Sequence, residues 1–238
     1  MTSERQQAYL QAMGIDVWKL RRPLAPITED LHLTKEMTEI NTRESMIAQM
    51  GWDALESAVT QCQACALYKT RTRPVFGVGR RDANLLIVGE APGANEDKQG
   101  EPFVGRGGQL LNAMLQAIDL NRQAIYIANI LKSRPPNNRD PQVDEVAACT
   151  PFLLRQITLI QPKVILAVGR IAAQYLLNTQ LPMARLRGQR FEYGPLKTPL
   201  LISYHPAYLL RSPGQKKKAW EDMQLLDSLL KSLASEAA

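Results

Sequence analysis

The chain has 238 residues, of which 45% are hydrophobic, and its 29 Lys and Arg against 23 Asp and Glu give a formal net charge of +6. This length allows one sizeable α/β domain with an appendage. The apolar runs are only as long as strands and the start MTSERQQ is unlike a signal peptide, so we expect a cytoplasmic protein with no membrane partner. The excess of positive charge is compatible with a polyanionic partner.

Residues 1–26 have the pattern of a short amphipathic helix, a glycine stop and a tryptophan-bearing peptide. The peptide contains Ile15, Val17, Trp18, Leu20, Arg21 and Arg22. This segment is too short to bury a core of its own. Residues 27–50 carry mixed charge with little periodicity, which is typical of a linker, so the folded domain is expected over residues 51–238.

From residue 51 onward, short strands rich in branched residues alternate with helical patterns. The strands are predicted at residues 84–90, 124–130, 164–169 and 200–205, and the helices at 55–70, 107–118, 143–160, 170–178 and 219–233. This alternation predicts a three-layer α/β sandwich with a central, mainly parallel sheet covered on both faces. Sites in such folds lie at the carboxyl ends of the strands, which places Glu90, Asn129 and His205 around one crevice.

A glycine-rich segment, GEAPGANEDKQGEPFVGRGGQLL at residues 89–111, follows the first of these strands and opens a helix. Exposed backbone N–H groups and a helix N-terminus in such a turn attract anions, so the segment is a candidate phosphate cradle. It matches neither a Walker A loop nor the GxGxxG motif of dinucleotide-binding folds. The pattern alone therefore leaves the ligand open.

Three cysteines are present, and two of them, Cys62 and Cys65, form a CxxC pair. A cytosolic chain of this length does not suggest a disulfide framework. The pair alone is compatible with a redox couple, with half of a metal site, or with chance. Together with Cys149 the chain offers three thiols, which is one short of a tetrahedral cage.

Three motifs in a fixed order carry a family resemblance. They are GEAPG..ED..GEPFVG at residues 89–105, Asn129 at a strand end before KSRPPNNRDP, and YHPAYLLR at residues 204–211. Over about residues 55–230 the chain closely resembles family 4 of the uracil-DNA glycosylases. The resemblance implies a uracil-DNA glycosylase-like fold, DNA as a partner, and hydrolysis of the N-glycosidic bond of a uracil flipped out of the helix.

The resemblance also implies roles for the residues around the crevice. Phe103 would stack on the extruded uracil, and Asn129 would hydrogen-bond its O4 and N3. His205 would stabilise the negative charge that grows on uracil O2 as the bond breaks. Each of these residues also has an ordinary structural interpretation, as a core phenylalanine, a strand-end cap or a histidine at the edge of the sheet.

The same resemblance assigns contacts with the sugar and with the DNA backbone. Glu90 is the leading acidic candidate for placing the attacking water, in a mechanism carried mainly by leaving-group stabilisation. The turn that lines the sugar side contains Gly89, Ala91 and Gly93. Leu209 or Leu210 would wedge into the space that the base leaves. Phosphates would be held by Arg139, Arg211 and nearby lysines.

Family 4 enzymes hold a four-iron four-sulfur cluster on four cysteines, and this chain departs from that pattern. Cys62, Cys65 and Cys149 match three of the ligands, whereas Ser133 occupies the remaining position. A serine oxygen is a harder and far less acidic donor than a thiolate. We therefore expect the cluster to be absent or labile, and the resemblance leaves open whether catalysis is retained.

The segment MTSERQQAYLQAMGIDVWKLRRP closely resembles the N-terminus of the psi subunit of bacterial DNA polymerase III. This resemblance implies docking on the tau/gamma subunits of the clamp loader, with Trp18 as anchor beside Ile15 and Leu20. Arg21 and Arg22 would contact the rim of the docking site. Two hypotheses follow: a uracil-DNA glycosylase carried on the replisome, or a non-catalytic psi subunit whose glycosylase fold is a scaffold for chi or other partners.

Overall fold

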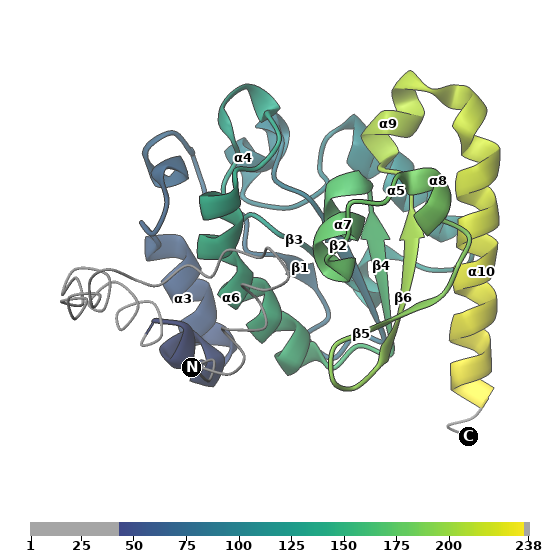
Figure 1. Ribbon diagram of the computed structural model, residues 1–238, viewed down its shortest axis with the longest axis horizontal. Coiled ribbons are helices and arrows are strands. Elements are labelled where there is room, and N and C mark those ends of the chain that lie inside the picture. The colour runs from purple at the N-terminus through teal and green to yellow at the C-terminus, as the bar shows by residue number, and fades with distance from the viewer. Residues whose placement is uncertain (1–42, 236–238) are drawn as a thin grey trace, which may run out of the picture. The chain divides into compact units, whose positions relative to one another are not determined.

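The computed structural model describes residues 43–235, which form a six-stranded sheet flanked by helices (Figure 1). The strand order is β1-β3-β2-β4-β6-β5, with β3, β2, β4 and β6 parallel and each edge strand antiparallel to its neighbour. The strands are β1 (Val78–Gly79), β2 (Leu85–Gly89), β3 (Tyr126–Asn129), β4 (Val164–Val168), β5 (Phe191–Tyr193) and β6 (Thr198–Ser203). The predicted mainly parallel sheet is therefore confirmed.

Helices cover both faces of the sheet, as the alternating pattern predicts. The α-helices are α3 (Trp52–Gln61), α4 (Ala94–Gln99), α5 (Arg106–Gln116), α6 (Val143–Ile160), α7 (Arg170–Leu177), α8 (Met183–Leu186), α9 (Pro206–Arg211) and α10 (Lys216–Ser235). Short 3-10 turns are η1 (Ala66–Lys69), η2 (Arg122–Ala124), η3 (Pro136–Asn138) and η4 (Pro213–Gln215). None of the helices within residues 43–235 is both long and apolar enough to cross a membrane.

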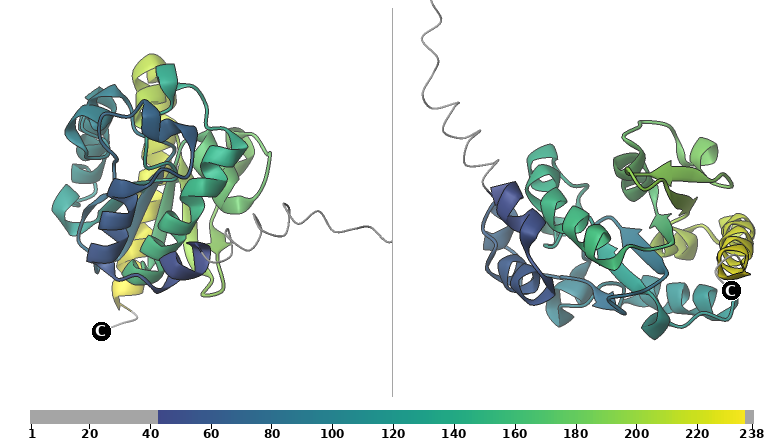
Figure 2. Two further views of the ribbon diagram at one scale, coloured as in Figure 1. Left: turned by 90° about the vertical axis from the view of Figure 1, so that its left-hand side faces the viewer. Right: turned by 90° about the horizontal axis from the view of Figure 1, so that it is seen from below.

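The core lies in two layers because successive strand residues point to opposite faces of the sheet. Leu86 and Val88 of β2 pack with α6, α7 and α8, whereas Leu85 and Ile87 pack with α5 and α10. The views in Figure 2 show the sheet between α6 and the yellow helix α10. All residues of the inner strands β2, β3 and β4 are buried, which explains their continuous apolar runs.

The sheet is doubly wound, which determines where a site can form. From β2 the chain crosses to β3 on one side and later to β4 on the other side, so the strand order reverses beside β2. Loops that leave β2 and β4 in opposite directions open a crevice at the carboxyl ends of these strands. The glycine-rich turn follows β2 and therefore lies at this crevice.

The structure differs from the sequence prediction in several elements. The first predicted helix ends at Gln61, before the CxxC pair, and resumes only as the turn η1. Residues 43–49, which the sequence analysis assigns to the linker, form a helix whose Ile47 is buried against α3. The edge strands β1 and β5 were not predicted, since strands of two or three residues give no periodic signal.

Candidate active site

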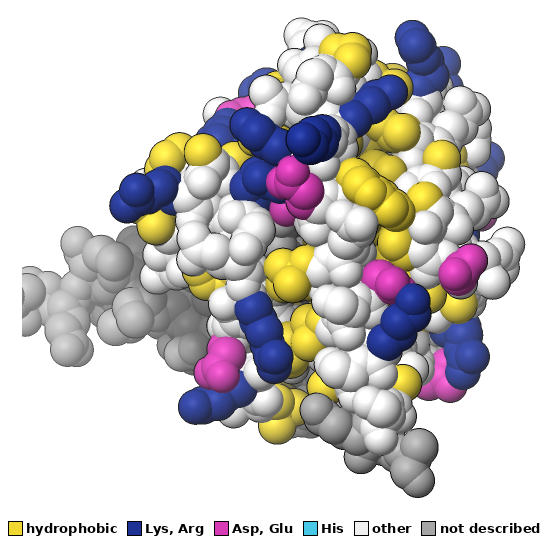
Figure 3. Space-filling view, turned by 90° about the vertical axis from the view of Figure 1, so that its right-hand side faces the viewer, with side chains coloured by type: hydrophobic (Ala, Val, Ile, Leu, Met, Phe, Trp, Pro, Cys, Tyr) yellow, Lys and Arg dark blue, Asp and Glu magenta, His cyan; other side chains and the backbone are white. Residues whose placement is uncertain are grey.

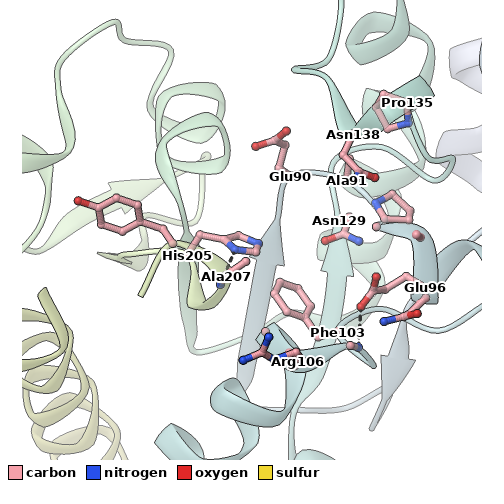
Figure 4. Close-up of a pocket in the computed structure, with 18 of the residues that line it drawn as sticks. Glu90, Ala91, Glu96, Phe103, Arg106, Asn129, Pro135, Asn138, His205 and Ala207 are labelled. Atoms are coloured by element: carbon pink, nitrogen blue, oxygen red, sulfur yellow. Dashed lines mark hydrogen bonds between the residues drawn. The ribbon is translucent and has the colours of Figure 1, made fainter. Parts of the chain in front are cut away.

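A cavity of about 480 Å³ opens at the carboxyl ends of the parallel strands. Glu90 follows β2, Asn129 ends β3, and His205 follows β6, so three separate strands bring these side chains to one place. Phe103 enters from the loop between α4 and α5. In Figure 4 the Phe103 ring, the Asn129 amide and the His205 imidazole converge on the same space.

The backbone of Phe103 is held in a left-handed conformation, with φ of 54°. A Cβ atom on Gly108 would lie 1.8 Å from the Phe103 carbonyl oxygen, so only glycine permits this approach. Arg122 donates hydrogen bonds to the carbonyl oxygens of Phe103 (3.3 Å) and Pro102. A non-glycine residue in this conformation needs support from its surroundings, and these contacts supply it.

Glu96 secures the other side of the same loop. One of its carboxylate oxygens accepts hydrogen bonds from the backbone N–H groups of Val104 and Gly105, each at 2.9 Å. Neither Glu96 nor Arg122 was predicted as a site residue. Glu96 is part of the GEAPG..ED motif, so the sequence offered a reason to consider it. Arg122 lies outside every motif, and nothing in the sequence indicates that it reaches this loop.

Asn129 is 2% exposed, and its Oδ1 atom has no hydrogen-bond partner within the described part of the chain. A buried carbonyl oxygen without a partner is costly, which marks it as an acceptor for a ligand. Gly89 makes room for it, because a Cβ atom there would lie 2.4 Å from Asn129 Oδ1 and 2.7 Å from Phe103 Cζ. The glycine at the end of β2 thus lets the amide and the aromatic ring share one wall.

His205 is the N-cap residue of α9, and its Nδ1 accepts a hydrogen bond from the Ala207 N–H at 3.1 Å. Because Nδ1 is an acceptor, the proton of the neutral ring is on Nε2. Burial, reinforced by the positive charge of Arg211, lowers the pKa of His205 to about 4. The ring stacks on Phe103 with centroids 5.5 Å apart. At neutral pH the cavity therefore contains an uncharged imidazole whose proton is on Nε2.

The surroundings of Glu90 raise the pKa of its carboxyl group. Burial, together with the negative charge of Asp140, raises the pKa of Glu90 to about 7, and the positive charge of Arg170 opposes this shift. Arg170 forms an ion pair with Asp140 at 2.8 Å. Such a carboxyl exchanges a proton near neutral pH, as a general base does. Ala91 and Gly93, from the predicted sugar-side turn, also line the cavity.

The predicted DNA contacts are only partly available at the rim of the cavity. Arg211 and Arg106 line the cavity and are exposed. Lys and Arg side chains gather on the upper part of the face in Figure 3, at the height of α9. Arg139 also lines the cavity, but its guanidinium forms a two-pronged pair with the buried Glu145, at 2.8 and 2.5 Å. Its side chain therefore supports the start of α6.

Of the two leucines predicted to wedge into the DNA, Leu209 is 1% exposed. A side chain enclosed in the core is not free to enter a DNA helix, so Leu209 is ruled out as the wedge. Leu210 is partly exposed, and the exposed Tyr208 beside it lines the cavity. The helix α9 thus presents Tyr208 and Leu210 rather than Leu209.

The residues at the cluster positions do not fit a four-iron four-sulfur cluster. Ser133 Oγ accepts a hydrogen bond from Arg71 Nη1 at 3.0 Å. The proximity of the Cys65 and Cys149 thiols lowers the pKa of Cys65 and raises that of Cys149. Within residues 43–235 no three Cys, His, Asp or Glu side chains gather as a metal site.

The predicted docking residues lie outside the described residues. They are Ile15, Trp18, Leu20, Arg21 and Arg22.

Comparisons with known proteins bear on the fold and on this cavity. The family model of the uracil DNA glycosylase superfamily matches residues 76–224. The chain is 41% identical over 184 residues to the type-4 uracil-DNA glycosylase of Archaeoglobus fulgidus, covering 74% of this chain and 92% of the relative. It is 38% identical over 193 residues to that of Thermotoga maritima, covering 80% and 97%.

A more distant relative is the type-5 uracil-DNA glycosylase of Thermus thermophilus, 32% identical over 120 residues, which cover 44% of this chain and 54% of the relative. The type-4 relatives match over nearly their whole length, and the family match spans the sheet and the lining of the cavity. The chain therefore belongs to the uracil-DNA glycosylase superfamily and, within it, to the type-4 uracil-DNA glycosylases.

Proposed function

We propose that this protein excises uracil from DNA by hydrolysing the N-glycosidic bond between the base and the deoxyribose. The observation that carries the proposal is the buried amide oxygen of Asn129, which has no hydrogen-bond partner within the described part of the chain. It lies beside Phe103 in a cavity that also contains the neutral imidazole of His205. Membership in the type-4 family supports the same reaction.

Recognition of the base follows from the donors and acceptors in the cavity. A uracil flipped out of the helix stacks on the Phe103 ring, and its Watson–Crick edge meets the Asn129 amide. The unpartnered Oδ1 accepts the uracil N3–H, while Nδ2 donates to O4. Cytosine presents an acceptor at N3 and a donor at C4, so both contacts become unfavourable. The amide thus selects uracil.

Cleavage releases uracil with the electron pair of the N-glycosidic bond, so negative charge grows on O2 of the departing base. The Nε2–H of His205 donates a hydrogen bond to this oxygen. Because the ring is neutral, no proton has to be transferred for this stabilisation. The rigid loop around Phe103 holds the base while the bond lengthens.

Water completes the reaction by attacking C1′ of the sugar. Glu90, beside Ala91 and Gly93, orients this water and accepts its proton as the new C–O bond forms. The raised pKa of Glu90, about 7, makes the carboxylate a better proton acceptor than an ordinary glutamate. Arg106 and Arg211 at the rim bind DNA phosphates.

The test is an excision assay on single-stranded and double-stranded DNA that contains one uracil, with abasic-site cleavage as the readout. The same duplexes with cytosine or thymine in place of uracil serve as controls. Excision of uracil alone supports the proposal. If the wild-type protein releases no uracil above background but still binds DNA, the catalytic proposal fails and the non-catalytic scaffold hypothesis is preferred.

We also propose that residues 1–26 tether this domain to the clamp loader through its tau/gamma subunits, and that residues 27–42 are a linker. The support is the psi-like sequence around Trp18 alone. Trp18→Ala should weaken binding to the clamp loader by about 2 kcal/mol, measured by calorimetry. Trp52→Phe in the folded domain is the control, and equal affinities would contradict the tether. A parallel titration with chi tests the scaffold role.

A further inference from the structure

We infer that a brace of buried and half-buried cations replaces the iron–sulfur cluster in this chain and joins the segments that the four cluster ligands would otherwise tie together. These segments are the CxxC loop with Cys62 and Cys65, the loop at Ser133 that follows β3, and the part of α6 around Cys149. Arg71, Arg43 and Lys132 form the brace.

Arg71 links the first two segments. Its Nη1 donates to Ser133 Oγ at 3.0 Å, and its Nη2 donates to the carbonyl oxygens of Thr60 and Cys62, both at 3.0 Å. The two carbonyls belong to the end of α3, where helical oxygens lack partners within the helix. The guanidinium therefore caps α3 and holds Ser133 at once, which explains why the helix ends before the CxxC pair.

Arg43 links the CxxC loop to α6. Its Nη2 donates to the Ala148 carbonyl oxygen at 3.0 Å and approaches Cys62 Sγ at 3.7 Å. The guanidinium also lies over the Phe152 ring, 5.0 Å from its centroid. Arg43 thus contacts α6 on either side of Cys149 and occupies hydrogen-bonding space beside the first cluster-type cysteine.

Lys132 links the loop after β3 to α6. It is 2% exposed, and its Nζ donates to Gln156 Oε1 (2.7 Å), the Asn129 carbonyl oxygen (2.9 Å) and the Phe76 carbonyl oxygen (3.3 Å). Three acceptors from three separate parts of the chain therefore surround the Lys132 Nζ. The residue directly before Ser133 is therefore fixed without any metal ligand.

The chemistry of these contacts disfavours a cluster at the same place. Iron–sulfur clusters are held by anionic thiolates, whereas the fourth position offers a neutral hydroxyl already engaged by Arg71. A protein with this brace folds and keeps Asn129 in place without iron.

The experiment compares thermal unfolding and iron content of the full-length protein purified without oxygen. The wild-type protein should contain no stoichiometric iron, and an iron chelator should leave its Tm unchanged. Arg71→Met should lower Tm by about 5 °C or more, because three hydrogen bonds from a cation are lost. Arg80→Met, which removes an exposed arginine paired with Asp82, is the matched control and should change Tm little.

Two further variants separate the brace from a general loss of packing. Arg71→Lys keeps the charge but not the forked geometry, so its Tm should lie between those of wild type and Arg71→Met. Ser133→Ala should lower Tm less in the Arg71→Met background than in the wild-type protein, since the two residues share one contact. Both variants are read out without uracil excision, so the inference stands or fails separately from the proposed function.

The inference is overturned if the anaerobic wild-type protein holds four irons per chain and loses stability when they are removed. It is also overturned if Arg71→Met unfolds at the same temperature as Arg80→Met. Ser133→Cys, reconstituted with iron and sulfide, tests the reverse direction and should bind more iron than the wild-type protein.

Discussion

The two ends of the short segment from Asn129 to Ser133 are built in opposite ways. Asn129 faces the cavity with an amide oxygen that has no partner among residues 43–235, whereas the Lys132 Nζ lies within hydrogen-bonding distance of three acceptors. Ser133 is likewise engaged by Arg71. Polar groups left unpaired at one end mark a place for a ligand, and fully paired groups at the other end mark structural support.

The cavity contains groups that are unfavourable in the free protein. Its residues include a carboxyl with a raised pKa in Glu90, a strained backbone at Phe103 and the unpaired amide of Asn129. Each feature is unfavourable in the free protein and becomes useful when uracil and water are bound. The comparison predicts that changes in the cavity reduce activity, whereas changes in the brace reduce stability.

The largest expected effect is at the cavity. Asn129→Ala or His205→Ala should slow excision by about a hundredfold or more, because each removes a group that stabilises the anionic leaving base. Their combined effect should be less than additive, since both act on one developing charge. DNA binding, measured by fluorescence anisotropy at several salt concentrations, should change little.

The matched control for these variants is Asn112→Ala. Asn112 also has an unpartnered buried Oδ1 among the described residues, but it does not line the cavity. Its replacement should leave the excision rate close to that of the wild-type protein. Equal losses of activity in Asn112→Ala and Asn129→Ala would remove the distinction between the two regions.

Substitutions in the brace should lower the thermal stability of the protein. Lys132→Met removes the Nζ donor from Gln156 Oε1 and the Asn129 carbonyl oxygen, whereas the Phe76 carbonyl oxygen keeps its hydrogen bond from Gln156 Nε2. Two buried acceptors that lose this donor should cost about 3 kcal/mol, or roughly 6–12 °C in Tm. Lys163→Met, at an exposed lysine, is the control for loss of charge. Thermal unfolding followed by circular dichroism measures the effect. A Tm shift in Lys132→Met as small as that of Lys163→Met would contradict the structural role.

The smallest expected effect is on stability and concerns the Glu90 carboxyl in the cavity. Because the folded-state pKa of Glu90, about 7, lies above the ordinary value of 4.5, the folded protein holds this proton more tightly than the unfolded chain. Stability is therefore lost as pH rises from about 4.5 to about 7. Glu90→Gln should raise Tm by about 2 °C at pH 8 and leave it unchanged at pH 4.

The same variant tests the chemistry. Wild-type excision should increase as pH rises through about 7, where Glu90 ionises. Glu90→Gln should lose this dependence and about a hundredfold in rate at pH 8. Glu192→Gln, at an exposed glutamate, is the control for both measurements. A Glu90→Gln protein that is less stable at pH 8 than wild type would show that the carboxylate supports the fold instead.

The sequence by itself determined the sheet and the place of the site. Branched runs of strand length alternating with helical patterns predict a parallel sheet, and burial of each strand on both faces follows from that pattern. Since parallel strands end at the same edge, Glu90, Asn129 and His205 had to come together there. Phe103 entered only through the resemblance to a family, because a buried phenylalanine alone does not differ from a core residue.

Only the tertiary structure decided which polar groups pair. Arg122 reaches the Phe103 loop, and Arg71 reaches Ser133 across 62 positions of sequence. Arg139 forms an ion pair with Glu145, and Leu209 packs into the core. Periodicity records which face of an element is buried, since that depends on neighbours along the chain. A hydrogen bond between distant segments depends on where the folded chain brings them, and no local pattern encodes that position.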